Sequence, residues 1–130
     1  MNIKLEKLVN CFDAMTVLHN QQGMDVVTAY RIMKNWDTVS HEIKCFDKQN
    51  MALCEKYGEK DKDGKIIVKD GKCEILKECR EKYLEELKSL LEENVDISIK
   101  TITLSSLYGV GLSPAQLATI DFMLEETDKI

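Results

Sequence analysis

The segment from Glu59 to Asp70, EKDKDGKIIVKD, has the residue spacing in this chain that is closest to a metal-binding loop. A calcium loop of the EF-hand type places oxygen ligands at positions 1, 3, 5 and 12 and a glycine at position 6. With Glu59 as position 1, these places are filled by Asp61, Asp63, Gly64 and Asp70. Glutamate is nevertheless too long for the first position, and Asp70 is too short to close the loop as a bidentate ligand.

The same segment has the features of a turn. Its lysines weaken the negative field that a divalent cation needs: Lys60, Lys62, Lys65 and Lys69. The β-branched run from Ile66 to Val68 favours a strand where an EF-hand would begin its exit helix. We therefore predict a KDG turn, a short strand and a DG turn, with no calcium bound.

Asp37, His41 and Cys45 follow one another at intervals of one helical turn, which is the arrangement of half a zinc site. A complete site needs further ligands from elsewhere in the chain. His19 is the only other histidine, and Cys54 falls on a different helix face from Cys45. Free cysteines are commonly plain core residues, so we predict no metal site and no cofactor.

The uncharged segment LSSLYGVGLSP is the strongest candidate for a functional surface. Tyrosine between apolar residues and glycines, in a loop that joins two predicted elements, suits protein recognition. The candidate binding residues are Leu107, Tyr108, Val110 and Leu112. A tight connection with Tyr108 packed inward is the alternative, and the sequence leaves both open.

Composition restricts the class of function. The 130 residues carry 18 basic and 23 acidic side chains, with a formal net charge of −5 and 44% hydrophobic residues. These values fit one globular domain over residues 1–130. Arg31 and Arg80 are the only arginines and no basic stripe is present, so direct nucleic-acid binding is not expected.

Cysteine usage and the absence of export signals predict a location in a reducing cytoplasm. The opening MNIKLEKL lacks the hydrophobic run of a signal peptide. Residues 101–120 carry no charge, but glycines, a proline and hydroxyls make them too polar to span a membrane. The five cysteines have no CxxC spacing and are expected to be buried free thiols: Cys11, Cys45, Cys54, Cys73 and Cys79.

Hydrophobic periodicity predicts an α+β fold that is mostly helical. A short strand at residues 3–5 precedes a helix over about Lys7–Gln21, and a long helix begins at an Asp25 cap and stops at Gly58. Its apolar positions alternate gaps of four and three, a heptad seam: Ile32, Trp36, Val39, Ile43, Phe46, Asn50, Leu53 and Tyr57. Asn50 is either a register device in helix pairing or part of a frayed tip.

A second long helix is predicted over about Cys73–Glu93, giving an antiparallel helical hairpin over about 25–93 with its tip at 58–72. Alternation then predicts a strand over about 95–104 with a bulge near Thr101, paired with the N-terminal strand at the base of the hairpin. Ser113, Pro114 and Gln116 form a helix-start signal for a capped C-terminal helix that runs to about Glu126.

Four stretches carry a resemblance: IKLEKLVN, AYRIMKN, KYGEKDKDGKIIVK and LSPAQLATIDFMLEE. Together they resemble a family of small uncharacterised proteins encoded by phages and prophages of Firmicutes, clostridia included. The similarity spans nearly the full length, but its motifs are structural, with no catalytic residues to carry over. The resemblance implies a phage-made protein that acts in the bacterial cytoplasm or in the virion.

Three functions remain open, and no constellation of residues supports an enzyme. The leading hypothesis is a non-enzymatic binding protein that inhibits a host protein, such as a component of CRISPR–Cas or another antiphage defence system. The alternatives are a structural component of the virion or tail assembly, and a protein that sequesters a nucleotide defence signal. The expected partner is a host or phage protein. Because the hairpin helices over 25–93 differ in length, we also predict a homodimer.

Overall fold

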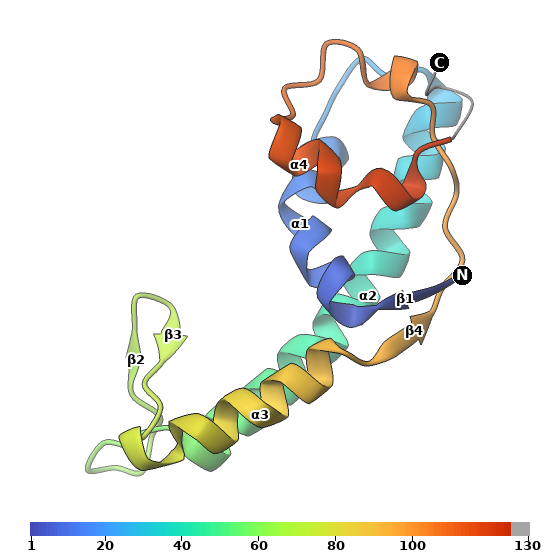
Figure 1. The fold of residues 1–130 in the computed structure, drawn as a ribbon. Coiled ribbons are helices and arrows are strands. Elements are labelled where there is room, and N and C mark those ends of the chain that lie inside the picture. Colours follow the sequence, from blue (N-terminus) through green and yellow to red (C-terminus); the bar gives the residue numbers. More distant parts are fainter. Residues whose placement is uncertain (126–130) are drawn as a thin grey trace. The chain divides into compact units, whose positions relative to one another are not determined.

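The computed structural model describes residues 1–125, which belong to two compact units. One unit consists of Met1–Ile43 together with the chain from Asn94 onward, and the other is Lys44–Glu93. The chain forms a long helix, small two-stranded antiparallel sheets and a short C-terminal helix (Figure 1). The predicted fold class, α+β and mostly helical, is therefore confirmed.

The sheet of the first unit joins the two segments that the sequence pattern predicts to pair. Strand β1 (Asn2–Lys4) runs antiparallel to β4 (Asn94–Asp96), with Ile3 opposite Val95. The predicted length of the second strand, about 95–104, is wrong, since β4 ends at Asp96 where its three-residue partner ends. The inward alternation nevertheless continues beyond the ladder, and Ile97 is buried.

Helix α1 (Leu5–His19) supplies most of the core of the first unit. Its buried face consists of Leu5, Leu8, Cys11, Ala14, Met15 and Leu18. Helix α4 (Pro114–Thr119) packs on α1 (Figure 1), and Lys7 on α1 forms an ion pair with Asp121 at 2.8 Å. The predicted helix, Lys7–Gln21, is displaced by two residues from the observed one.

Helix α2 (Val26–Tyr57) begins and ends where its local signals predict. The Asp25 carboxylate accepts a hydrogen bond from the backbone N–H of Thr28 at 3.0 Å, and hydrogen bonds from Thr28 lower the pKa of that carboxyl. At the other end, a side chain on Gly58 would collide with the carbonyl oxygen of Cys54. Every position of the predicted heptad seam is buried or half-buried, so the seam is confirmed.

The second unit pairs the end of α2 with α3 (Arg80–Leu91). The predicted start of this helix, Cys73, is wrong, because Lys72–Cys73 forms strand β3 and pairs with β2 (Val68–Lys69). The residues that follow β3 already use their backbone groups elsewhere. The N–H of Glu59 donates to Glu74 at 2.7 Å, and the N–H of Leu76 donates to Tyr57 at 2.9 Å.

The segment Glu59–Asp70 forms the predicted succession of turn, strand and turn. The Asp61 carboxylate accepts hydrogen bonds from the backbone N–H groups of Asp63 and Lys65, at 2.9 and 3.0 Å. This is the Asx geometry of a turn. At the second turn, Asp70 and Gly71 have φ angles of 53° and 77°, which fits a two-residue type I′ hairpin.

Helix α4 (Pro114–Thr119) has the predicted capping box. The Ser113 hydroxyl accepts from the N–H of Gln116 at 3.1 Å, and the Gln116 side chain accepts from the N–H of Ser113 at 3.0 Å. The helix is shorter than predicted, because the chain bends after it to pair with Ile102: the N–H of Ile102 donates to Met123 at 2.8 Å. The predicted end, Glu126, lies outside the described residues.

Candidate functional site

The uncharged loop of the first unit is held by its own hydrogen bonds. Residues Leu104–Leu107 form a 3-10 turn whose cap is Thr103, and the Thr103 hydroxyl accepts from the N–H of Ser106 at 3.3 Å. The Ser106 hydroxyl in turn donates to the Thr103 carbonyl at 2.6 Å. After the turn, the N–H of Val110 donates to Leu107 at 3.0 Å. These bonds order the loop through its own backbone and hydroxyl groups.

The four predicted binding residues differ in their exposure to solvent. Leu107 is 6% exposed, whereas the adjacent Tyr108 is 95% exposed. Val110 and Leu112 are half-buried, and all four line one depression of about 420 Å³. The alternative in which Tyr108 packs inward is therefore wrong.

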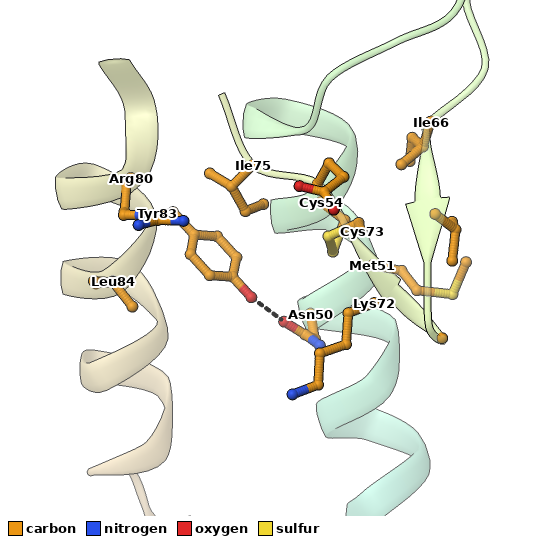
Figure 2. A pocket seen from close by; sticks show the side chains of 13 residues that line it. Asn50, Met51, Cys54, Ile66, Lys72, Cys73, Ile75, Arg80, Tyr83 and Leu84 are labelled. Carbon is orange, nitrogen blue, oxygen red and sulfur yellow. Dashed lines mark hydrogen bonds between the residues drawn. A yellow bond between two sulfur atoms is a disulfide. The ribbon is translucent and has the colours of Figure 1, made fainter. Parts of the chain in front are cut away.

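A larger groove, which the sequence reasoning missed, lies within the second unit (Figure 2). Its volume is about 980 Å³, and its walls come from the end of α2, the β2–β3 hairpin and the start of α3. The apolar part of the lining consists of Met51, Ile66, Val68, Ile75 and Leu84. The polar part includes Asn50, Lys72, Glu74, Arg80 and Tyr83.

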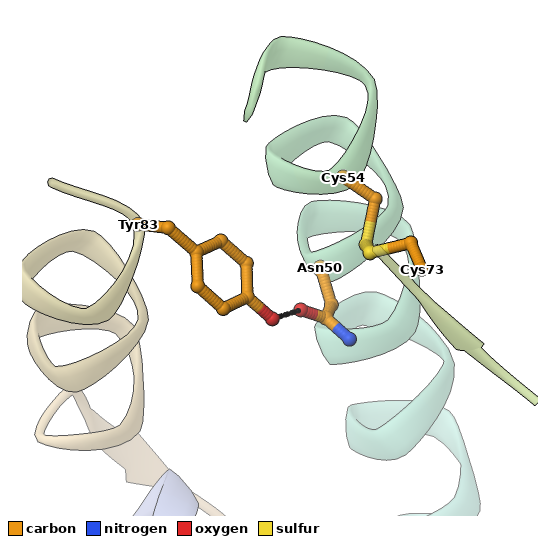
Figure 3. Close-up of a disulfide and its surroundings, with 4 residues drawn as sticks. All are labelled: Asn50, Cys54, Cys73 and Tyr83. Carbon is orange, nitrogen blue, oxygen red and sulfur yellow. Dashed lines mark hydrogen bonds between the residues drawn. A yellow bond between two sulfur atoms is a disulfide. The ribbon is translucent and has the colours of Figure 1, made fainter. Parts of the chain in front are cut away.

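A disulfide between Cys54 on α2 and Cys73 on β3 forms part of this groove (Figure 3). The two Cα atoms are 6.1 Å apart and 19 residues apart in the chain. The prediction of free thiols is therefore wrong for this pair, because the β2–β3 hairpin brings Cys73, the second residue of β3, back against α2. It is also wrong about the burial of Cys45, which is exposed.

Cys11 is the buried thiol that the prediction describes. Burial among apolar side chains disfavours the thiolate and raises the pKa of Cys11 to about 11. Cys79 is half-buried and, like Cys11, lies outside any disulfide. The fully buried thiol at position 11 is thus a core residue with little nucleophilic character near neutral pH.

Polar side chains link the two helices of the second unit. The Tyr83 hydroxyl donates to the Asn50 side-chain oxygen at 3.3 Å (Figure 3), which supports the interpretation of Asn50 as a register device. Lys56 and Glu86 form an ion pair at 3.4 Å. Hydrogen bonds from Tyr57 and Lys56 lower the pKa of the Glu86 carboxyl.

The candidate metal ligands are not assembled into a centre. Among residues 1–125, no group of three or more His, Cys, Asp or Glu side chains could hold a metal ion. The Asp61 carboxylate, a ligand in the calcium hypothesis, is occupied by backbone N–H groups of its own turn. Asp37, His41 and Cys45 thus lack the additional ligands that a zinc site needs within the described part of the chain.

No helix within the described range is both long enough and apolar enough to cross a membrane. In comparisons with known proteins, the chain matches no family model, no curated protein and no solved structure.

Proposed function

We propose that this chain is a phage-encoded, non-enzymatic binding protein that inhibits a host protein of an antiphage defence system such as CRISPR–Cas. The observation that carries the binding role is Tyr108, a nearly fully exposed aromatic residue on an ordered, uncharged loop. Tyrosine is enriched among the residues that dominate the binding energy of protein interfaces. Its ring gives apolar contact area and its hydroxyl gives a hydrogen bond.

The hydrogen bonds around Thr103 support this role because they fix the loop before a partner arrives. A preordered loop loses less conformational entropy on binding than a mobile one. Leu107 anchors the loop in the core, so contact with a partner through Tyr108 need not expose apolar surface elsewhere. The part of the proposal that concerns a phage protein and a host target rests on the family resemblance.

The proposed site of action is the host cytoplasm, where glutathione and thioredoxin keep most thiols reduced. There the Cys54–Cys73 pair would be open to reduction. Because the Tyr108 loop and the disulfide belong to different units, the proposed binding does not require the disulfide.

The third function, sequestering a nucleotide signal, is less well supported, because Arg31 is already used. Its guanidinium donates to the Thr101 carbonyl at 2.9 Å and pairs with Glu125 at 3.5 Å. A phosphate would have to compete with both partners for this side chain.

We also propose that the protein forms a homodimer. Light scattering at micromolar concentration would contradict this proposal by giving the monomer mass of 14.9 kDa.

The test is affinity purification of the tagged protein from phage-infected cells, with partners identified by mass spectrometry. The proposal predicts a host defence protein at stoichiometric yield with the natural chain and its loss with Tyr108→Ala. Tyr30→Ala is the matched control, because Tyr30 is also an exposed tyrosine but lies on α2. Capture of head or tail proteins instead would replace the inhibitor by an assembly factor, and equal capture by both variants would remove Tyr108 from the interface.

A further inference from the structure

The groove of the second unit has the size and lining of a small-molecule site. Its volume of about 980 Å³ lies at the upper end of the range of roughly 300–1,000 Å³ for ligand pockets. Three of its apolar side chains, Met51, Val68 and Leu84, are 63%, 59% and 53% exposed. An apolar ligand would remove this surface from water, which is favourable without any directional contact.

The charged groups of the groove complement an anion. Lys72 comes from β3 and Arg80 from the first turn of α3, while Glu74 is the single acidic residue among the lining side chains. Within residues 1–125, neither Lys72 nor Arg80 takes part in an ion pair. Both cations are therefore available to a negative charge that enters with a ligand.

The chemistry of these groups favours a carboxylate. A guanidinium can bind a carboxylate through two parallel N–H donors, which fixes the head group as well as attracting it. Asn50 adds a neutral donor, since its oxygen accepts from Tyr83 and its amide nitrogen points away from that bond (Figure 3). Figure 2 shows Arg80 on α3 beside Leu84, and Lys72 across the groove beside Asn50.

We propose that this groove binds an amphiphilic carboxylate of the fatty-acid class. The aliphatic chain lies on Met51, Val68 and Leu84, and Arg80 binds the carboxylate, with Lys72 as the second cation. The disulfide between Cys54 and Cys73 attaches the β2–β3 wall to α2. Backbone hydrogen bonds from Glu59 to Glu74 and from Leu76 to Tyr57 also attach the chain after β3 to the end of α2 and remain when the disulfide is reduced. This site does not depend on the Tyr108 loop, so either proposal can fail without the other.

The probe is dodecanoate, titrated below its micellar concentration into the oxidised full-length protein and followed by calorimetry. The expected result is saturable binding at one site per chain. Dodecanol, which has the same chain length and no charge, should bind about tenfold more weakly, as expected for the loss of one charge-assisted contact. Dodecyltrimethylammonium should bind more weakly still, because its head group repels the two cations.

Three groove variants and one control locate the site. Leu84→Glu should abolish binding, and Arg80→Gln should weaken it by about tenfold. Lys88→Gln, on α3 but outside the groove lining, should bind as the natural chain does. Leu84 is more than half exposed, so a glutamate at this position stays in contact with water and Leu84→Glu is expected to fold. Circular dichroism checks that it does. Met51→Gln provides a second apolar variant from the opposite helix.

Three outcomes would overturn the proposal. The first is the absence of saturable binding to the folded, oxidised protein. The second is undiminished binding in both Leu84→Glu and Arg80→Gln, which would place the ligand elsewhere. The third is equal affinity for dodecanoate and dodecyltrimethylammonium, which would leave an apolar surface without selectivity for a carboxylate.

Discussion

Asn35 is the buried polar residue whose replacement tests the packing of the first unit most directly. Its side chain is 0% exposed and pairs with both backbone groups of Lys100. The amide nitrogen donates to the Lys100 carbonyl at 2.8 Å, and the amide oxygen accepts from the Lys100 N–H at 2.8 Å. Lys100 lies beyond the end of β4 at Asp96, so its backbone groups have no partner strand among the described residues. The Asn35 side chain supplies the donor and the acceptor that a neighbouring strand would otherwise provide.

Replacement of Asn35 by Leu keeps a side chain of similar size but leaves the donor and the acceptor of Lys100 unpaired. A buried polar group without a partner costs about 1–3 kcal/mol. Both bonds are only part-buried, so water offsets some of this cost for each of the two groups. We therefore expect the free energy of unfolding to fall by about 2–4 kcal/mol, a large share of the roughly 5–15 kcal/mol typical of native proteins.

Urea unfolding monitored through the fluorescence of Trp36 measures this change in the correct unit, because Trp36 stacks on Phe12 and His19 of α1. The matched control is Asn20→Leu, since the Asn20 amide also donates to a backbone carbonyl, that of Thr16 at 2.9 Å, but does so at the exposed surface. A loss below about 0.5 kcal/mol for Asn35→Leu, which is the usual size of a surface effect, would refute the reasoning.

A second variant, Asn35→Asp, gives the same prediction a pH dependence. The carboxylate would face the Lys100 carbonyl without a proton to donate, so the folded state favours the protonated acid and raises its pKa above the unfolded value. The penalty of the variant should therefore be smallest below the unfolded pKa and should grow as the pH rises through the folded pKa. A penalty that does not change between pH 3.5 and pH 7, or that shrinks as the pH rises, would contradict the two-bond description.

Three further predictions concern Cys54, Cys11 and Glu86. Cys54→Ser should lower the stability of that unit by about 3 kcal/mol, from the loop entropy of a 19-residue separation, as hydrogen exchange would measure; a loss equal to that of Cys45→Ser would contradict it. Cys11, with a pKa of about 11, should resist alkylation at pH 8 in the folded protein, while the exposed Cys45 reacts. Peptide mass spectrometry measures both sites, and faster modification of Cys11 than of Cys45 would contradict the prediction. The lowered pKa of Glu86 means that its stabilisation is present above the unfolded pKa and is lost as the pH falls through the folded one. Glu86→Gln should therefore unfold with a weaker dependence on acid pH, and unchanged acid sensitivity would show that this carboxylate contributes nothing.

Sequence patterns predict those features of this fold that depend on a few neighbouring residues. The capping box at Ser113 involves a partner three positions away, and the turn at Asp70–Gly71 depends on two adjacent left-handed residues. The heptad seam is longer, but every gap in it is one helical turn. Each of these rules depends on residues that lie within a few positions of one another, which is why a sequence pattern can identify them.

The errors occur where distant backbone takes the hydrogen bonds that a local rule would assign. The segment from 73 to 79 has a helical pattern, yet Leu76 pairs with Tyr57, the last residue of α2, and Glu74 pairs with Glu59 just beyond it. The helix begins at Arg80 instead. The hydrogen bonds between Asn35 and Lys100 join residues that are 65 positions apart in the sequence. No short pattern indicates it, although a polar residue beside the apolar seam at Trp36 is a signal that a partner is needed.

The orientation of Tyr108 illustrates the same limit of local sequence patterns. Leu107 and Tyr108 are adjacent, and both are apolar enough to enter the core, so composition does not decide which one does. The 3-10 turn over Leu104–Leu107 directs Leu107 inward, and its neighbour is left in solvent. Burial of an aromatic ring stabilises a fold by roughly 1.5–3 kcal/mol or more. Tyr108 is not buried, so the fold lacks this stabilisation, although several hydrogen bonds hold the loop in one conformation. This is the arrangement that the proposed contact of Tyr108 with a partner requires.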